Sequence, residues 1–337
     1  MKALKAVPKT LIIVSKPSQV TLFLPAVEAA FPGHDIAFVS LMAGLYKFDW
    51  PRGRAYADYP VVETPKWKAG SPFTGFNANP NIYVSSTALG KEASRSPERV
   101  LSLLTGADQI IYAADPGDGD AYSFTVLMRE VMSIDLETTP LTSCLIYSMW
   151  PSAIAAAFAN PGSTADAEFV ALRRYGETRK FFEYNYNLNA QVFFSRALSG
   201  VGIEESRLGV SSISALSRWT LQLLYAYRRG EIPVGMANAY RLLQAWTGTG
   251  KYPVRAMASP LSTATIVENL HRTGLIENAG ITPLGERLLA QLHPGCEDAD
   301  LPARLDAWCQ DWPASRDAMT RYLKTYFGRQ KRFLEKH

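Results

Sequence analysis

The first half of the chain alternates short apolar runs with segments of helical spacing. Four apolar runs have the length of buried strands: residues 10–14, 35–40, 109–114 and 141–148. Apolar residues recur at helical spacing after two of these runs, at residues 20–30 and 121–128. Buried parallel strands read as continuous apolar runs and alternate with helices along the chain. The pattern therefore predicts one α/β domain over residues 1–152, with residues 44–75, rich in Pro, Trp and Tyr, as a surface loop.

After residue 152 the pattern changes to one helix after another. Helical spacing marks residues 152–158, 166–187, 211–229, 234–246, 262–273 and 314–335, and a further helix starts at residue 282. A short apolar run and a glycine turn separate the helix at 262–273 from the one at 282. This order of two helices and a short ribbon is typical of a winged-helix-like module. Residues 153–337 are therefore predicted to form a mainly α-helical, winged-helix-like domain.

The amino-acid composition says more about the cellular compartment of the protein than about its binding partner. The 35 Lys and Arg residues against 31 Asp and Glu residues give a net charge of +4, which permits a nucleic-acid partner without requiring one. The three cysteines are scattered and lack the spacing of a zinc site, which favours a reduced, cytoplasmic environment. The apolar run near the start of the chain is too short for a signal peptide or a membrane span. We expect a soluble cytoplasmic protein without a membrane partner.

An acidic turn follows the apolar run at residues 109–114. It places Asp115, Asp118 and Asp120 at the carboxyl end of a predicted parallel strand, the edge at which α/β sheets bind ligands. Three carboxylates so close together repel one another unless a cation or a basic group lies among them. The turn therefore predicts a Mg²⁺ site. A solvated Asp/Gly turn without a metal is the alternative that the pattern leaves open.

Several stretches occur in an order shared with one family of enzymes. They are residues 11–18 (LIIVSKPS), 59–67 (YPVVETPKW), 114–120 (ADPGDGD), 182–187 (FEYNYN), 208–232, 259–270 (SPLSTATIVENL) and 281–285 (ITPLG). Taken in this order, they resemble motifs of the type IA DNA topoisomerases of the topoisomerase III kind, including "IAEKPS", "DPDREGE" and "GTPSTRA". The resemblance implies an α/β Toprim domain with a Rossmann-like parallel sheet, followed by a single-strand-binding domain.

The resemblance also implies a large deletion. In the family, a long segment between the motifs matched by residues 208–232 and 259–270 carries the arch and the gate domain with the nucleophilic tyrosine. Fewer than thirty residues join these two stretches here. So short a segment cannot enclose a duplex, so the gate domains are expected to be missing near residue 233. Strand passage is expected to be lost with them.

The residues at the implied Toprim site are eroded. Ser15 stands where the family has a glutamate, and a hydroxyl cannot act as a carboxylate general acid or metal ligand. Lys16 is retained and is suited to neutralising a phosphate. The acidic turn is one residue short of the family motif. Asp115 and Asp120 keep the outer positions, and Asp118 takes one of the two middle positions.

Some residues expected to face DNA are also replaced. Three family arginines correspond to Ala190, Leu216 and Thr263. Tyr252, in the sequence YPVR at residues 252–255, is a weak candidate nucleophile because it resembles the family motif "YPR". Its alternative is a tyrosine in a loop before a helix, the interpretation that its position next to residues 259–260 favours.

Seven further basic residues are predicted to contact nucleic acid, together with Lys16. They are Arg173, Arg174, Arg179, Lys180, Arg218, Arg228 and Arg229. A solvated helix face is the alternative for each group, as it is for the basic tail at residues 329–332. The alternating Tyr/Asn run at residues 184–189 is open to two interpretations, a base-contacting groove or a core with polar caps.

Three functional hypotheses follow. In the first, the chain is a catalytically silent, truncated topoisomerase relative that binds DNA, most readily single-stranded, as a scaffold subunit of a DNA-processing or mobile-element complex with other proteins. The second is a minimal Mg²⁺-dependent nicking or relaxing enzyme that uses Asp115, Asp118, Asp120 and Tyr252. The third is a pure protein-interaction module, which takes the loss of the arginines at face value. The first hypothesis agrees best with the missing gate and with Ser15.

Overall fold

In the computed structural model, the chain divides into two units. The first comprises Met1–Asp49 and Lys66–Glu177, and the second comprises Trp50–Pro65 and Thr178–His337. The structure describes residues 7–41, 46–69, 82–86, 90–94, 97–203, 216–232, 236–253, 260–277 and 280–336. This division differs from the predicted boundary at residue 152 in two ways. The junction falls within a helix, and residues 50–65 belong to the second unit.

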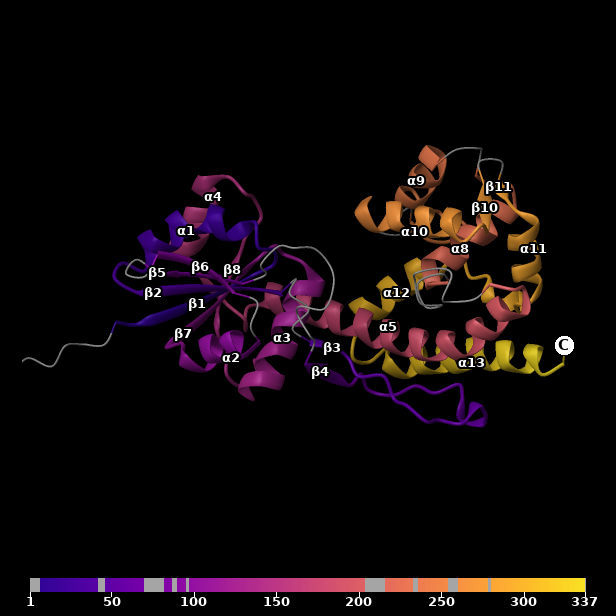
Figure 1. Cartoon of the computed structure of the whole chain (residues 1–337), viewed down its shortest axis with the longest axis horizontal. Coiled ribbons are helices and arrows are strands. Elements are labelled where there is room, and N and C mark those ends of the chain that lie inside the picture. The colour runs from indigo at the N-terminus through magenta and orange to yellow at the C-terminus, as the bar shows by residue number, and fades with distance from the viewer. Residues whose placement is uncertain are drawn as a thin grey trace, which may run out of the picture. The chain divides into compact units, whose positions relative to one another are not determined.

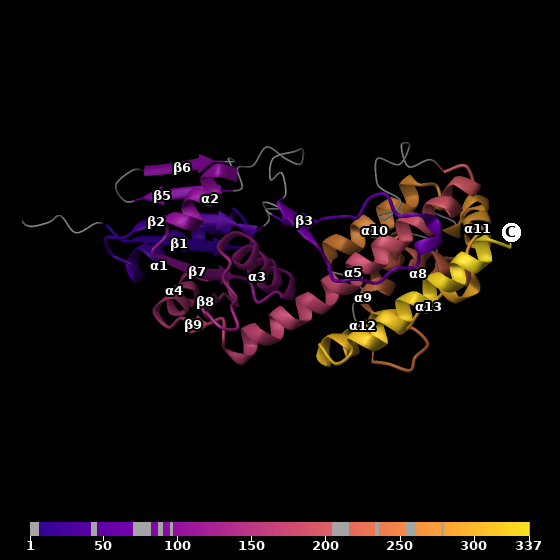
Figure 2. The same cartoon turned by 90° about the horizontal axis from the view of Figure 1, so that it is seen from below.

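A mixed sheet of seven strands forms the first unit, in the order β6-β5-β2-β1-β7-β8-β9 (Figure 2). Its strands are β1 (Lys9–Val14), β2 (Asp35–Ser40), β5 (Ile82–Ser86), β6 (Gly90–Ser94), β7 (Gln109–Ala114), β8 (Thr142–Leu145) and β9 (Gly162–Ser163). The central strands β1, β2, β7 and β8 are parallel, while β5, β6 and β9 pair antiparallel towards the edges. A small ribbon pairs β3 (Tyr46–Phe48) with β4 (Trp67–Ala69). The predicted α/β class is confirmed, with a sheet that is mixed and not purely parallel.

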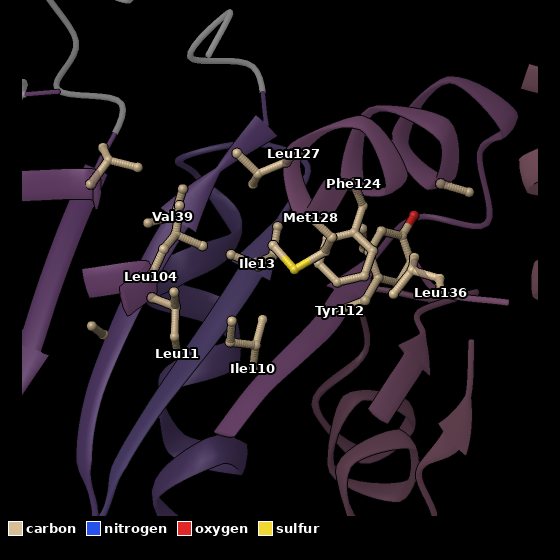
Figure 3. Packing of buried hydrophobic residues seen from close by; sticks show 14 of the residues in the cluster. Leu11, Ile13, Val39, Leu104, Ile110, Tyr112, Phe124, Leu127, Met128 and Leu136 are labelled. Atoms are coloured by element: carbon tan, nitrogen blue, oxygen red, sulfur yellow. The ribbon is translucent and has the colours of Figure 1, made fainter. Parts of the chain in front are cut away.

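Helices cover both faces of this sheet. Helices α1 (Gln19–Ala30) and α4 (Pro151–Ala159) lie over one face, and α2 (Pro97–Gly106) and α3 (Asp118–Met132) lie over the other (Figure 1). Side chains of β1 alternate between the two resulting cores: Ile12 packs with Phe23 of α1, and Ile13 packs with Phe124 of α3 (Figure 3). Because both faces are covered, the central strands are apolar along most of their length, which makes them recognisable in the sequence.

Helix α5 (Ala167–Gly200) runs from the first unit into the second. Gly176 lies where this helix passes the start of α3. A Cβ atom at Gly176 would lie 2.1 Å from the carbonyl oxygen of Asp118 and 2.7 Å from Cβ of Tyr122. Only glycine fits so close an approach of two backbones. The contact fixes the first turn of α3, which carries two of the acidic residues predicted to form the site.

The second unit is mainly helical. Its helices after α5 are α8 (Arg218–Arg228), α9 (Met236–Gln244), α10 (Pro260–Arg272), α11 (Pro283–Ala290), α12 (Leu301–Gln310) and α13 (Arg316–Leu334), with short 3₁₀ turns η2 (Tyr56–Asp58) and η3 (Pro294–Cys296). An antiparallel ribbon of β10 (Ile276–Glu277) and β11 (Gly280–Ile281) separates α10 from α11, in the predicted order. Thr282 caps α11 by accepting a hydrogen bond from the amide of Gly285 at 3.1 Å. In the described part of the chain, no helix combines the length and apolar character needed to cross a membrane.

Aromatic side chains join α5 to α13, which lie side by side in Figure 1. The ring of Phe327 lies 5.3 Å from that of Tyr186 and 5.9 Å from that of Phe193, centroid to centroid. All three rings are fully buried. Burial of such large rings contributes much of the hydrophobic free energy of a helical core. The aromatic residues of the Tyr/Asn run at 184–189 are therefore core residues of the second unit.

The asparagines of the same run hold the extended segment at residues 50–65. The side-chain amide of Asn189 accepts from the amide of Val61 at 2.8 Å and donates to its carbonyl at 2.7 Å. Asn185 forms the same pair of bonds with the backbone of Glu63, at 2.8 and 2.9 Å. Each side chain thus replaces one residue of a neighbouring strand. Because a buried amide must find partners, these two asparagines assign the segment to the second unit.

We expect Asn189→Ala to destabilise the second unit by about 1–3 kcal/mol, because it leaves the backbone N–H and C=O of Val61 without their partners. Asn187→Ala is the matched control, since Asn187 lies on the same helix and donates none of these bonds; its cost should be about 0.5 kcal/mol or less. Urea unfolding followed by circular dichroism measures both values. Equal losses of unfolding free energy in the two variants would contradict the role of Asn189 in holding residues 50–65.

Candidate functional site

The predicted acidic site lies at the carboxyl edge of the sheet. Strands β1 and β7 are parallel neighbours, with Ile13 beside Tyr112 in the register. Parallel strands end at the same edge, so the loop after β1 meets the loop after β7. This pairing brings Ser15 and Lys16 to Asp115 and to the start of α3. Residues nearly a hundred positions apart in the sequence thus form one cluster.

Ser15 is the centre of this cluster. Its side chain is almost fully buried, and its hydroxyl donates to Oδ2 of Asp120 at 2.6 Å. The same hydroxyl oxygen accepts from the backbone amide of Asp115 at 3.2 Å. Ser40, at the end of β2, donates its hydroxyl to the carbonyl of Ser15 at 3.1 Å. Three strands therefore converge on a serine where the resemblance implies a glutamate.

Asp115 is bound by two side chains from the loop and helix after β1. Gln19 donates its Nε2 to Oδ1 of Asp115 at 2.7 Å, and the ammonium of Lys16 lies 3.4 Å from Oδ2. Gln19 is itself oriented by the amide of Lys16, which donates to its Oε1 at 2.9 Å. Gln19 is not among the site residues predicted from the sequence. Its spacing of three residues from Lys16, at the first position of α1, was the available signal.

Asp118 and Asp120 lie in the first turn of α3, where the partial positive charge of the helix N-terminus favours carboxylates. Even so, the pKa of Asp120 is raised. Burial of its carboxyl is the largest cause, and the charge of Asp115 adds to it, while the hydrogen bond from Ser15 and the charge of Lys16 oppose it. The raised pKa means that the folded chain holds a proton on Asp120 more tightly than an unfolded chain does.

The donor set of this cluster fits Mg²⁺ poorly. A magnesium ion would have to share the carboxylate oxygens of the cluster with their hydrogen-bond donors. Both oxygens of Asp115 and one oxygen of Asp120 already accept hydrogen bonds from protein groups. Throughout the described ranges, no three His, Cys, Asp or Glu side chains are grouped so that they would hold a metal ion. Magnesium binding stays a prediction from the sequence.

Most of the basic residues predicted to contact nucleic acid have acidic partners. Arg173 is buried and donates to Glu137 at 2.7 Å. The ammonium of Lys180 lies 2.9 Å from Glu183. Arg228 lies 3.6 Å from Glu297, and Arg229 pairs with both Glu231 and Glu297. These residues balance charge within the fold.

Three members of the predicted set remain. The guanidinium of Arg218 lies over the ring of Trp219, 4.7 Å from its centroid, and burial lowers the pKa of Arg218. Arg179 is exposed, and its charge helps to lower the pKa of the Glu183 carboxyl. Arg174 is also exposed on α5. None of these observations by itself identifies a phosphate-binding surface.

The second unit also contains the residues that replace family arginines and the candidate nucleophile Tyr252. Leu216 and Ala190, which replace family arginines, are buried in the second unit. Thr263 belongs to α10, and its side chain lies outside the described residues, as do residues 208–215 and Arg255. Tyr252 is half-buried, with the ammonium of Lys251 5.6 Å from the centroid of its ring. Tyr252 belongs to the second unit, whereas the aspartates belong to the first.

Sequence reasoning gave little weight to a basic surface on α13. This helix carries Arg321, Lys324, Arg329 and Arg332 as exposed side chains. Among the residues that the structure describes, none of these four has an acidic partner. The signal in the sequence was the excess of basic over acidic residues at 316–334, where Asp317 is the only acid. These cations are therefore available to an external anion.

The raised pKa of Asp120 predicts a pH-dependent effect of Asp120→Asn. Protonation stabilises the folded chain below the pKa of an unfolded aspartate, about 3.9, and this contribution is lost as the pH rises through the folded pKa. Asparagine cannot ionise, so the variant should gain stability relative to the native chain between about pH 4 and pH 7. Urea unfolding at the two pH values measures the change. A difference that stays constant with pH would be the contrary result.

No protein-family model matches the chain, and no curated protein is significantly similar to it in sequence. The resemblance to type IA topoisomerases therefore stays a prediction. It depends on the short motifs of the sequence and on the residues that align with them, Ser15, Lys16 and the three aspartates among them.

Proposed function

We propose that this chain is a catalytically silent nucleic-acid-binding protein that binds single strands and serves as a subunit of a larger DNA-processing assembly. The unpaired basic face of α13 is the observation that carries the proposal. Exposed cations without acidic partners repel one another and gain free energy when phosphates displace their counterions. Arg321, Lys324, Arg329 and Arg332 meet this condition as far as the described residues are concerned.

The silent character of the proposed protein rests on Ser15. A metal-dependent cleavage site of the Toprim type would need a carboxylate at this position, as the resemblance implies. The hydroxyl of Ser15 instead bonds Asp120, and Lys16 and Gln19 bond Asp115. These bonds support a site kept for its fold and no longer for its chemistry. The relation to Toprim and winged-helix-like domains is part of the same proposal.

Binding of a labelled single-stranded oligonucleotide at two salt concentrations tests the proposal. We expect a dissociation constant on the order of micromolar at low salt, rising steeply with salt. Replacement of Arg321, Lys324, Arg329 and Arg332 by alanine should lower the slope of log K against log salt by about 3, since each single-strand phosphate contact contributes about 0.7. Arg287→Ala, an exposed cation on α11, is the control and should leave the slope nearly unchanged. Binding without any salt dependence would refute the proposal.

A supercoiled plasmid incubated with the protein and Mg²⁺ tests the silent site. We expect the plasmid to stay supercoiled, because Ser15 occupies the position at which the resemblance implies a catalytic glutamate. Relaxation that disappears in the variant Tyr252→Phe would instead establish the minimal enzyme described above. Retained relaxation in that variant would indicate a contaminating enzyme, so the pair of proteins is needed.

A further inference from the structure

A groove in the second unit is lined by aromatic and basic side chains. It lies among the turn η3, helix α12 and helix α13, which are the orange and yellow segments of Figure 1. Its volume of about 510 Å³ falls within the range of small-molecule binding sites. The residues that matter for its chemistry are Asp298, Arg304, Trp308, Arg321, Tyr322 and Arg329.

One wall of the groove is a platform formed by the side chains of Arg304, Trp308 and Tyr322. The guanidinium of Arg304 lies over the ring of Tyr322, 5.2 Å from its centroid, and the ring of Trp308 meets that of Tyr322 edge to face at 5.3 Å. Trp308 and Tyr322 are half-buried, so part of each ring faces the groove. Unpaired bases stack on aromatic rings and on guanidinium planes.

Asp298 holds this platform in place. It accepts a hydrogen bond from the hydroxyl of Tyr322 at 2.8 Å, and its other oxygen lies 3.5 Å from the guanidinium of Arg304. Burial and the charge of Asp298 raise the pKa of Tyr322, so the phenol keeps its proton and its bond. The platform is thus organised before a ligand arrives, which lowers the entropic cost of binding.

Positive charge exceeds negative charge among the side chains that line the groove. Both acids of the groove are already paired, Asp298 with Arg304 and Glu297 with two arginines of α8 and the loop after it. Arg321 and Arg329 also line the groove and have no acidic partner among the described residues. A ligand of this groove therefore combines a flat ring with negative charge.

The spacing of the two free arginines favours a strand over a single small anion. Arg321 and Arg329 lie eight residues apart on α13, which is about 12 Å along a helix axis. Thr325, midway between them, also lines the groove. Successive phosphates of a strand can contact both arginines while one base occupies the platform between them.

The geometry points to a base-binding subsite: this groove takes one unpaired base of a single-stranded nucleic acid on the platform of Trp308 and Arg304, with the flanking phosphates on Arg321 and Arg329. The inference rests on the proposed nucleic-acid-binding function and adds to it a location and a mode of recognition. Stacking accepts any base, so binding here is expected to show little sequence preference.

Tryptophan fluorescence tests whether a base reaches the platform. Titration of the full chain with an oligothymidylate should quench the emission, and an abasic oligonucleotide of the same length should quench it much less. In Trp308→Phe most of the quenching should disappear while the dissociation constant changes by no more than about twofold, because phenylalanine still offers a ring for stacking. Unchanged quenching in this variant would overturn the inference.

Affinity gives a second, independent readout. Trp308→Leu should weaken binding of the oligothymidylate by about tenfold or more and leave binding of the abasic strand unchanged, since only a base can stack. Lys324→Ala is the matched control, because Lys324 lies on the same helix and does not line the groove. It should weaken binding of both strands equally.

The possible outcomes separate this inference from the proposed function. Salt-dependent binding could be equal for the abasic strand and the oligothymidylate and insensitive to Trp308→Leu. That result would refute base binding in the groove and would still support phosphate binding by the basic face of α13. The absence of salt-dependent binding would refute both. Displacement of the bound strand by polyglutamate as effectively as by unlabelled oligothymidylate would assign the groove to an acidic peptide and overturn the inference. Quenching by oligouridylate as well as by oligothymidylate would support it for both kinds of strand.

Discussion

The carboxylates at the edge of the sheet repel one another, and side chains of the protein itself offset part of this repulsion. Lys16 supplies a positive charge to Asp115, while Gln19 and Ser15 supply hydrogen-bond donors. A glutamate in place of Ser15 would add a third charge beside Asp120, which only a cation could offset. A hydroxyl at this position removes that need. The choice between a carboxylate and a hydroxyl at this position therefore sets the electrostatics of the whole cluster.

The same balance of charge distinguishes two groups of basic residues. An arginine already paired with a carboxylate, such as Arg173 with Glu137, must give up that pair to bind a phosphate, so its net gain is small. A cation without an acidic partner among the residues that the structure describes, such as Arg321 or Arg329, releases counterions without the loss of such a pair. The proposed binding of nucleic acid therefore falls on α13 and not at the positions matched by the topoisomerase motifs.

The central strands and many of the helices could be predicted from the sequence because their apolar patterns are long and regular. The strand of residues 109–114 and the ribbon between α10 and α11 are examples. The domain membership of residues 50–65 could not, because it depends on the amides of Asn185 and Asn189, and a Tyr/Asn run does not reveal which backbone its amides will bond. The acidic turn was visible as a cluster of charges, whereas the partners of Asp115 required the register of β1 and β7.

The groove could not be predicted from the sequence, for a different physical reason. Trp308 packs against Phe182 of the core, 6.2 Å between ring centroids, and also lines the groove. The position of Trp308 in the helical pattern is that of a core residue, and one side of it does pack against the core. The excess of positive charge on α13 can be read from the sequence, but the pairing of Asp298 with Arg304 and Tyr322 cannot, since the three come from a loop and two helices. A half-buried aromatic beside cations that lack acidic partners in the described part of the chain is thus a feature that only the folded chain shows, and the proposed recognition of a base depends on it.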